Sequence, residues 1–166
     1  MSIDSTLFRE ALGSLPAGVS VITAHHKGDA IGITVSSFTS LSLHPPLILF
    51  CLDLKSKSRD AFKPRKKFAV NILSDAQKHL AQHFAATGKK SWDAAPYEET
   101  KPGTKNSVRL LKNSIASLSC TVTKNIKSGD HVIIIGKVDA CSAVDKQARP
   151  LLYWRRHYHA LGNITD

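Results

Sequence analysis

Residues 32–42 and the segment that follows them constrain this chain more than any other part of it. A strand pattern ends there in a run of Ser and Thr, Pro45-Pro46 then turns the chain, and residues 47–52 are entirely apolar. Hydroxyl-rich residues and prolines between two strand patterns are typical of turns in antiparallel β structure. The sequence therefore predicts a chain built mainly from paired strands.

The same segment places hydrogen-bond donors beside an apolar wall. Its hydroxyl and backbone N–H groups, together with residues 47–52, suit a flat, amphipathic ligand with a phosphate tail, such as a flavin. The ring of such a ligand is buried while its carbonyls, ring nitrogens and phosphate stay hydrogen-bonded. Hydroxyl-rich turns are also common without a ligand, so the residues alone leave a plain Ser/Thr-rich hairpin as the alternative.

Seven or so segments have the apolar composition or the alternation of β-strands. Turn signals around Gly28 and Gly129 join four of them into two hairpins. Many short strands with tight turns and few helices indicate an antiparallel barrel. The strands are expected at residues 19–24, 31–35, 47–52, 68–73, 116–122, 131–141 and 151–154, the last of which is expected to close the sheet.

Two helices and one long loop are expected between the strands. Apolar residues recur at helical spacing over residues 7–15, and a capping-box pattern at residues 74–77 precedes a second helix that ends near Gly88. Residues 89–108 surround Trp92 with Lys, Pro, Gly and Thr and show no clear period. We expect a long ordered or semi-mobile loop there, and loops of that length in compact domains are usually functional.

The composition fits one domain spanning residues 1–166, with 42% hydrophobic residues and no stretch long enough to span a membrane. No basic region followed by an apolar one stands at the N-terminus, so a secretory signal is not expected. Cys51, Cys120 and Cys141 are odd in number and widely spaced, which argues against disulfides. These features predict a cytoplasmic protein without a membrane association.

The formal net charge of +10 would suit nucleic acid, a membrane surface or anionic small molecules. The densest basic groups, residues 55–67 and Lys89-Lys90, have no interleaved aromatic residues for stacking bases, so nucleic acid is not the expected partner. His79 and His83 have the i, i+4 spacing of metal ligands, but the glutamate of a zinc hydrolase is missing between them. We therefore expect no metal.

Six segments, taken in order, resemble the short flavin reductase family. The match runs from about residue 8 to residue 161. It rests on Phe8-Arg9, residues 16–23, the Ser/Thr-rich stretch 32–42, residues 68–73, Gly129-Asp130-His131 and residues 150–154.

The resemblance implies an antiparallel split β-barrel of the Greek-key, FMN-binding type with a few flanking helices, and a homodimer. It also implies hydride transfer from NADH or NADPH to FMN or FAD. In many members the reduced flavin then diffuses to a separate monooxygenase component. Because no Rossmann glycine pattern is present, the nicotinamide is expected to bind as a substrate in an open groove over the flavin.

The resemblance also assigns flavin-site residues. The ring is expected to lie on backbone N–H groups of the loop that includes Gly32, Thr34, Val35, Ser36 and Ser37. The ribityl and phosphate groups are expected at Asp53, Lys55, Ser56 and Ser58, where hydroxyls and a positive charge suit a phosphate. Phe84 and Trp92 are expected to wall the ring or cover the adenine of a dinucleotide, although the helical spacing of Phe84 equally permits core packing.

The nicotinamide side of the site rests on fewer residues. His131 of the Gly-Asp-His motif is expected near the nicotinamide, with a positioning role, because hydride transfer at C4 of the nicotinamide needs no acid or base from the protein. Arg9, Arg155 and Tyr158 are the further candidates for the dinucleotide. Arg156 stands where the family often has glycine.

Two other kinds of function stay open at this point. A flavin-dependent oxidase or oxygenase could act on its own organic substrate with the same fold. A non-catalytic protein could bind a flavin or, given the charge, nucleic acid. Flavin reduction by a nicotinamide separates the enzyme from the carrier, and steep salt dependence would mark a nucleic-acid binder.

Overall fold

The computed structural model of the chain describes residues 3–88, 90–142 and 144–162. Its helices are α1 (Ser5–Gly13) and α2 (Lys78–Ala85), with the 3-10 turns η1 (Arg59–Phe62) and η2 (Asp75–Gln77). Its strands are β1 (Ala17–Gly18), β2 (Ser20–His26), β3 (Asp29–Val35), β4 (Thr39–Ser42), β5 (Leu47–Asp53), β6 (Lys67–Ile72), β7 (Tyr97–Glu99), β8 (Arg109–Leu111), β9 (Ala116–Ser128), β10 (His131–Cys141), β11 (Leu151–Trp154) and β12 (His157–Ala160). No helix in these ranges is long and apolar enough to cross a membrane.

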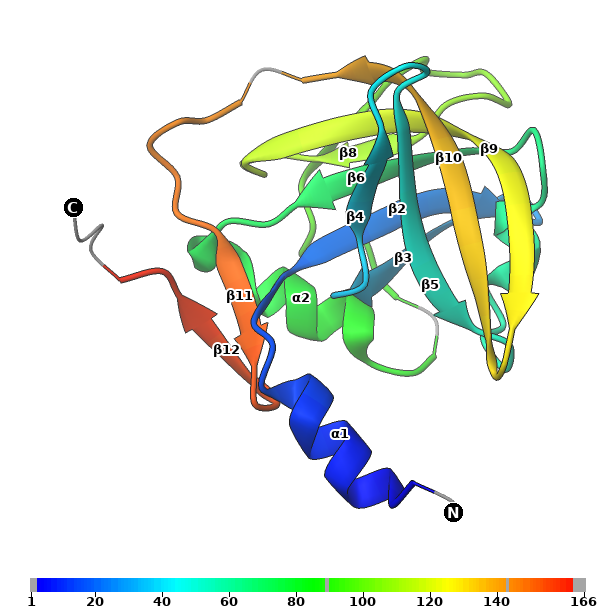
Figure 1. Cartoon of the computed structure of the whole chain (residues 1–166). Coiled ribbons are helices and arrows are strands. Elements are labelled where there is room, and N and C mark those ends of the chain that lie inside the picture. The colour runs from blue at the N-terminus through cyan, green and yellow to red at the C-terminus, as the bar shows by residue number, and fades with distance from the viewer. Residues whose placement is uncertain (1–2, 89, 143, 163–166) are drawn as a thin grey trace.

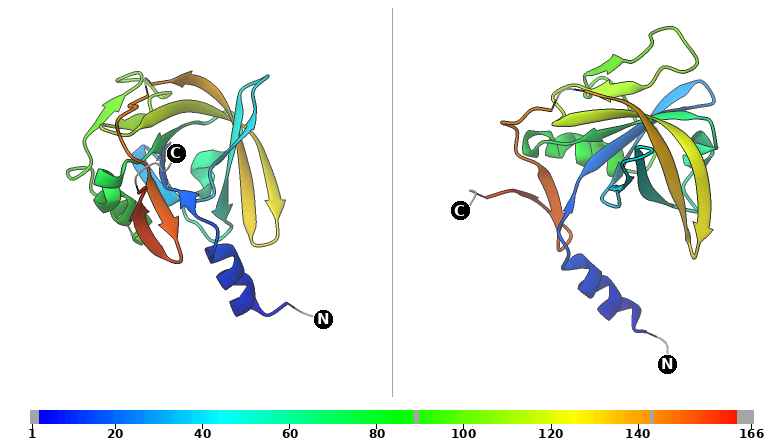
Figure 2. Two further views of the ribbon diagram at one scale, coloured as in Figure 1. Left: turned by 60° about the vertical axis from the view of Figure 1, so that its left-hand side comes forward. Right: turned by 45° about the horizontal axis from the view of Figure 1, so that its top comes forward.

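Seven strands form one antiparallel sheet in the order β3-β2-β6-β9-β10-β5-β4. This sheet curls around a hydrophobic core into a barrel, as Figure 1 and Figure 2 show. Because the order begins at β3 and ends at β4, the barrel is split between these two edge strands. The predicted mainly-β fold, a split antiparallel barrel with flanking helices, is confirmed, and so are both predicted hairpins, β2–β3 and β9–β10.

Three short regions differ from the sequence prediction. Thr39–Ser42, expected within the hydroxyl-rich loop, is a strand, because it pairs with β5 across the double-proline turn. Leu151–Trp154 (β11) was expected to close the large sheet but does not join it. β1 pairs with one edge of β11 and β12 pairs with the other, so β11 is the central strand of a separate three-stranded sheet. The loop at residues 89–108 contains β7, which pairs with β8.

Three phenylalanines fix the centre of the barrel. Phe50, Phe62 and Phe68 are fully buried and meet edge to face, with ring centroids 5.3 to 6.1 Å apart. Gly136 on β10 faces this cluster, and a Cβ atom there would lie 2.4 Å from Cζ of Phe68. A glycine is therefore required at this point of β10 for the aromatic ring to fit against the backbone.

A second core lies between α2 and the sheets. The predicted capping box is present, since the Ser74 backbone N–H donates to Oε1 of Gln77 at 3.2 Å. The helix that follows buries Leu80, Ala81 and Phe84 against residues of β2 and β11. This packing brings β11 and β12 beside α2, although these two strands are not part of the seven-stranded sheet.

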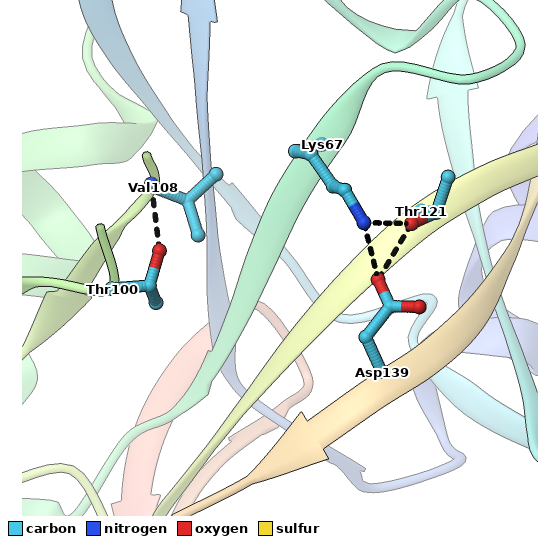
Figure 3. A network of polar contacts seen from close by, with 5 residues as sticks. All are labelled: Lys67, Thr100, Val108, Thr121 and Asp139. Carbon is cyan, nitrogen blue, oxygen red and sulfur yellow. Dashed lines mark hydrogen bonds and ion pairs between the residues drawn. The ribbon is translucent and has the colours of Figure 1, made fainter. Parts of the chain in front are cut away.

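The segment that precedes β8 is held by aromatic and backbone contacts. The indole N–H of Trp92 donates to the Ala30 carbonyl at 3.1 Å, and the Arg109 guanidinium lies over the Tyr97 ring at 4.0 Å from its centroid. Figure 3 shows the Val108 backbone N–H donating to the Thr100 hydroxyl at 3.2 Å, just beyond the β7–β8 pairing. No period could be recognised in this part of the sequence because each strand is only three residues long.

Helix α1 forms as predicted, yet it has no buried residue. It projects from the body of the molecule (Figures 1 and 2). Its first turn is capped by the Asp4 carboxylate, which accepts hydrogen bonds from the Thr6 and Leu7 N–H groups. Its far end is tied to the β11–β12 hairpin, because Trp154 donates its indole N–H to the Ser14 carbonyl at 2.9 Å and the Arg155 N–H donates to the Gly13 carbonyl at 3.0 Å.

A charged cluster links three neighbouring strands of the barrel (Figure 3). The Lys67 ammonium on β6 donates to the Asp139 carboxylate at 2.9 Å and to the Thr121 hydroxyl at 2.6 Å, and that hydroxyl donates to Asp139 at 2.5 Å. Asp139 lies at an irregularity in the pairing of β9 with β10. Partial burial pushes the pKa of Asp139 upward, but the hydrogen bonds from Thr121 and Lys67 outweigh it and hold the pKa below its ordinary value.

Replacing Asp139 with Asn removes this charge while keeping the side-chain shape. Because the folded-state pKa of Asp139 is lowered, its contribution is fully present above the unfolded pKa of about 3.9 and is lost as the pH falls through the folded pKa. We expect Asp139→Asn to lower the free energy of unfolding at pH 7 by about 0.2–1 kcal/mol, the range for partly exposed ion pairs. Urea unfolding of both proteins between pH 7 and pH 2 measures the difference.

The matched control is Asp60→Asn, which removes a more exposed ion pair with Lys63. It should have a smaller effect at pH 7. A loss from Asp139→Asn that stays constant down to pH 2 would show that the charge is not its source.

Candidate functional site

The end of β3 presents the first part of the candidate site. Thr34 and Val35 are its last residues, and Ser36 and Ser37 follow as exposed residues. The Thr34 hydroxyl donates to the Ala81 carbonyl of α2 at 2.7 Å. The Ser37 hydroxyl accepts from the Cys51 N–H at 3.0 Å and donates to the Cys51 carbonyl at 3.2 Å. These two hydroxyls therefore fix the loop to α2 and to β5.

A cavity of about 170 Å³ lies beside this loop. Thr34, Val35 and Ser36 form one side of it, and two tyrosines of the β11–β12 hairpin form another. The full lining is Val19, Thr34, Val35, Ser36, Ala85, Tyr153 and Tyr158. The lining thus combines residues of the hydroxyl-rich loop with two aromatic rings, which suits one end of a flat aromatic ring with polar edges.

The two tyrosines are direct partners across the β11–β12 pair, with ring centroids 5.2 Å apart. Burial raises the pKa of the Tyr158 phenol, and the neighbouring Tyr153 raises it further. Tyr158 therefore keeps its proton at neutral pH and can donate a hydrogen bond. Tyr158 was predicted, whereas Tyr153 and Val19 were missed; the pairing of Tyr153 with Tyr158 follows once residues 155–156 are recognised as a two-residue turn.

The conformation of that turn explains why the family often has glycine where this chain has Arg156. Arg155 and Arg156 have φ values of +47° and +67°, the left-handed conformation that two-residue hairpin turns require. Glycine adopts it without steric cost, which accounts for the glycine often found at this position in the family that the sequence resembles. The Arg155 guanidinium lies over the Trp154 ring at 4.6 Å from its centroid.

A tight turn after β5 forms the second part of the site. The Asp53 carboxylate accepts from the Lys55 N–H at 2.7 Å, and the Ser56 hydroxyl accepts from the Ser58 N–H at 3.3 Å. Asp53 therefore shapes the turn through its carboxylate rather than offering a donor to a ligand. The Ser58 hydroxyl makes no capping hydrogen bond to η1, and Lys55 is exposed, so these groups remain suited to an anion.

His131 stands beside that turn. It is the first residue of β10 and lies opposite Asp53 in the register, while the Leu54 N–H donates to the Asp130 carbonyl at 2.9 Å. Nδ1 of His131 contacts the Asp130 carboxylate at 2.6 Å, and this hydrogen bond lowers the pKa of Asp130. The side chain of His131 is 47% exposed, so its ring is within reach of a ligand at the surface.

Strand β5 brings these parts together. Ser37 contacts Cys51, and Asp53 lies two residues further along the same strand, about 7 Å away at the usual rise of a strand. Three of the predicted segments, at residues 34–37, 53–58 and 130–131, therefore meet at one end of the barrel. The cavity with Tyr153 and Tyr158 adjoins the first of them.

Four predicted site residues lie elsewhere or have other roles. Gly32 is buried within β3, and a Cβ there would lie 2.4 Å from the Phe84 ring. Phe84 is 2% exposed and packs against Trp92, with centroids 5.1 Å apart, so both rings belong to the second core rather than to an open wall. Arg9 is exposed on the projecting helix α1.

The residues described contain no group of three or more His, Cys, Asp or Glu side chains arranged to hold a metal ion. His83, one of the two histidines at metal-ligand spacing, contacts the Ser91 carbonyl through Nε2 at 2.7 Å.

Comparison with known proteins matches residues 12–162 to the flavin reductase like domain. The chain is 36% identical over 157 residues to the reductase subunit HsaB of a flavin-dependent monooxygenase from Mycobacterium tuberculosis, covering 94% of this chain and 82% of that protein. It is 33% identical over 162 residues to an actinorhodin polyketide dimerase of Streptomyces coelicolor, covering 97% and 89%.

A solved structure shares the fold closely. It is the NADH:FAD oxidoreductase SgcE6 of Streptomyces globisporus in complex with NAD and FAD fragments, with a TM-score of 0.88, 27% identity, and coverage of 98% of this chain and 96% of that one. The family match spans the strands of the barrel and both strands of the β11–β12 hairpin, which carries Tyr153 and Tyr158. The chain belongs to the flavin reductase like domain family.

Proposed function

We propose that this chain is an NAD(P)H-dependent flavin reductase, which passes a hydride from NADH or NADPH to FMN or FAD and supplies reduced flavin to a separate monooxygenase. One observation carries the proposal: residues 34–37, 53–58 and 130–131 meet at one end of the barrel beside a cavity walled by tyrosines. The similarity to a monooxygenase reductase subunit and to an NADH:FAD oxidoreductase supports the same reaction.

The cavity fits one end of a flavin. Its volume of about 170 Å³ is below the range of about 300–1,000 Å³ that is usual for sites holding a whole ligand of drug size. The rest of the flavin then extends across Ser36 and Ser37 toward the turn after β5. A ring in this position has one face open to a second ligand, as a reductase needs if the nicotinamide is a substrate rather than a resident cofactor.

The chain's own groups hold the ring and the phosphate in this arrangement. Backbone N–H groups at residues 34–37 would face the pyrimidine edge, where negative charge gathers when the flavin is reduced, and they favour the reduced form. The Ser56 and Ser58 hydroxyls and the Lys55 ammonium would bind the phosphate. The bound flavin itself supplies the hydride-accepting chemistry.

His131 and Tyr158 have positioning roles in this proposal. His131 is half exposed and held by Asp130, so it would orient the nicotinamide carboxamide or a nearby phosphate over the ring. Tyr158, protonated at neutral pH, would donate a hydrogen bond from the opposite side of the cavity. Arg155 and Arg156 at the hairpin tip would add positive charge for the dinucleotide phosphates.

We also propose that the protein is a homodimer in the cytoplasm. The partly formed cavity and the exposed apolar face of α1 support a second copy that completes the surface. The thiols Cys51, Cys120 and Cys141 are all free, as suits a reducing compartment.

One observation favours a second candidate, a flavin enzyme acting on its own substrate: the similarity to a polyketide dimerase.

The purified protein should oxidise NADH or NADPH with FMN or FAD as acceptor, well above the rate of the same mixture without protein. Because both substrates meet in the same site, the rate should saturate in flavin and in nicotinamide. Absorbance at 340 nm under varied flavin and nicotinamide measures this, and quenching of flavin fluorescence measures binding. Flavin binding without nicotinamide oxidation would indicate a carrier, and the absence of both would exclude the flavin site.

Replacing Lys55 and Ser58 together with Ala should weaken FMN binding by about 1–3 kcal/mol, because charge-assisted hydrogen bonds to the phosphate are lost. The affinity for riboflavin, which has no phosphate, should change little. Fluorescence titration with both ligands measures the two affinities, and Lys57→Ala on the same turn is the matched control. Equal losses for FMN and riboflavin would mean that this turn does not bind the phosphate.

Replacing His131 with Ala should lower kcat/KM for the reduced nicotinamide by about 10- to 100-fold, since only the positioning of the hydride donor is lost. Flavin affinity should remain nearly unchanged. Stopped-flow reduction of bound flavin separates the two quantities, and His79→Ala on α2 serves as a control that should behave like the wild type. An unchanged dependence on the nicotinamide would remove His131 from the site.

A further inference from the structure

The tip of the β11–β12 hairpin consists of two arginines in a conformation that arginine rarely adopts. Arg155 and Arg156 are exposed and have φ values of +47° and +67°. In this left-handed region the Cβ atom of an L-residue lies too close to the following carbonyl oxygen, whereas glycine forms the same turn without that strain. The turn alone therefore does not account for the presence of two arginine side chains.

The two arginines differ in what their side chains contact. The Arg155 guanidinium lies over the Trp154 ring, 4.6 Å from its centroid. The Arg156 side chain makes no hydrogen bond, ion pair or ring contact with any residue that the structure describes. A strained residue whose side chain stabilises nothing in its own chain indicates a function outside the fold.

The tip is held in a fixed place beside the tyrosine-lined cavity. Tyr153 and Tyr158, one on each strand of the hairpin, line that cavity together with the hydroxyl-rich loop. Arg156 is two residues from Tyr158, about 7 Å away at the usual rise of a strand, and its side chain extends that distance further. The indole N–H of Trp154 donates to the Ser14 carbonyl at 2.9 Å and so anchors the tip.

We propose that Arg156 binds the 2′-phosphate of NADPH and thereby makes NADPH the preferred hydride donor over NADH. The inference rests on the proposed function, which leaves the choice between the two nucleotides open. The nicotinamide reacts over the flavin in the cavity. The adenosine end of the dinucleotide, which carries the 2′-phosphate, then lies away from the cavity, toward the tip of the hairpin.

The chemistry of the 2′-phosphate suits a free guanidinium better than the pyrophosphate does. A phosphate monoester carries a charge of about −1.5 to −2 at neutral pH and has three free oxygens. Each phosphate of the pyrophosphate bridge carries a single negative charge and has only two free oxygens. The planar fork of a guanidinium donates two parallel hydrogen bonds to a phosphate, and Arg156 has no partner in the described chain that competes for it.

Glycine at this position removes the guanidinium without disturbing the turn. Arg156→Gly relieves the left-handed strain, so its thermal unfolding midpoint should equal or exceed that of the wild type. The matched control is Arg65→Gly, because Arg65 is also exposed, has a φ of +71° and lies outside the site. The constants kcat and KM for NADPH and for NADH are measured for each protein at saturating flavin.

We expect the wild type and the control to have a kcat/KM for NADPH at least about 10-fold above that for NADH, the effect of charge-assisted hydrogen bonds to the phosphate. Arg156→Gly should raise KM for NADPH by about 10- to 100-fold with kcat unchanged, because the contact is the same in the ground state and the transition state. The constants for NADH should not change. Arg156→Lys keeps the charge without the fork and should retain part of the preference.

The two dinucleotides also identify a wrong assignment. An equal loss for NADPH and NADH would place Arg156 on the pyrophosphate that they share, and no loss for either would remove it from the site. Both results overturn the inference while the reductase activity stands. A wild type that oxidises neither nucleotide overturns the proposed function and the inference together.

A binding measurement checks the same contact without turnover. Adenosine 2′,5′-bisphosphate has the phosphate that distinguishes NADPH, and AMP lacks it. By calorimetric titration the wild type should bind the bisphosphate at least about 10-fold more tightly than AMP, and Arg156→Gly should bind both equally. Equal affinities in the wild type would overturn the inference.

Discussion

The packing of Phe68 against Gly136, between Phe50 and Phe62, sets the register on which the other features depend. These residues lie on β6, β10, β5 and η1, so one aromatic contact locks three strands of the barrel and the turn before β6. A shift of one residue along any of these strands would turn its buried side chains toward solvent. The same register sets His131 opposite Asp53 and brings the turn after β5 next to the Gly-Asp-His turn. Core packing thus determines the geometry of the candidate site.

The polar side chains of the site divide into two groups. Those of Thr34, Ser37 and Asp53 are used within the protein: each forms a hydrogen bond that holds a loop in place. Backbone N–H groups, the Ser58 hydroxyl and the Tyr158 phenol are then left to face a ligand, and so is the O–H of Ser56, whose oxygen already accepts from the Ser58 N–H. A loop that is fixed before the ligand arrives loses less conformational entropy on binding. The hydroxyl-rich composition of residues 32–42 therefore reflects the construction of the loop as much as contact with a ligand.

The sequence predicted the long elements well and the short ones poorly. Strand β10 was expected over its full length from its long apolar run, and β9 was expected at residues 116–122, where apolar residues alternate with Ser and Thr. β1, β4, β7, β8 and β12 have two to four residues, too few for any period, and exist because of partners distant in the sequence. The sequence left Phe84 open between a wall of the flavin ring and core packing for a related reason: whether a ring fills a site or a core depends on what faces it, here the backbone of β3 at Gly32. Tyr153 needed the pairing of β11 with β12, which follows only once residues 155–156 are recognised as a two-residue turn.

The split in the barrel has a consequence for the stability of the protein in storage. β3 is one of the two edge strands of the large sheet, and the part of such an edge that α2 and the Trp92 indole leave uncovered is a template on which strands of other molecules can add. Residues 34–37 continue from the end of that strand, so a ligand bound there also shields part of the edge. Removal of the ligand exposes it, and the ligand-free protein should aggregate more readily by adding strands. Flavin in the buffer would then act as a solubility agent as well as a substrate.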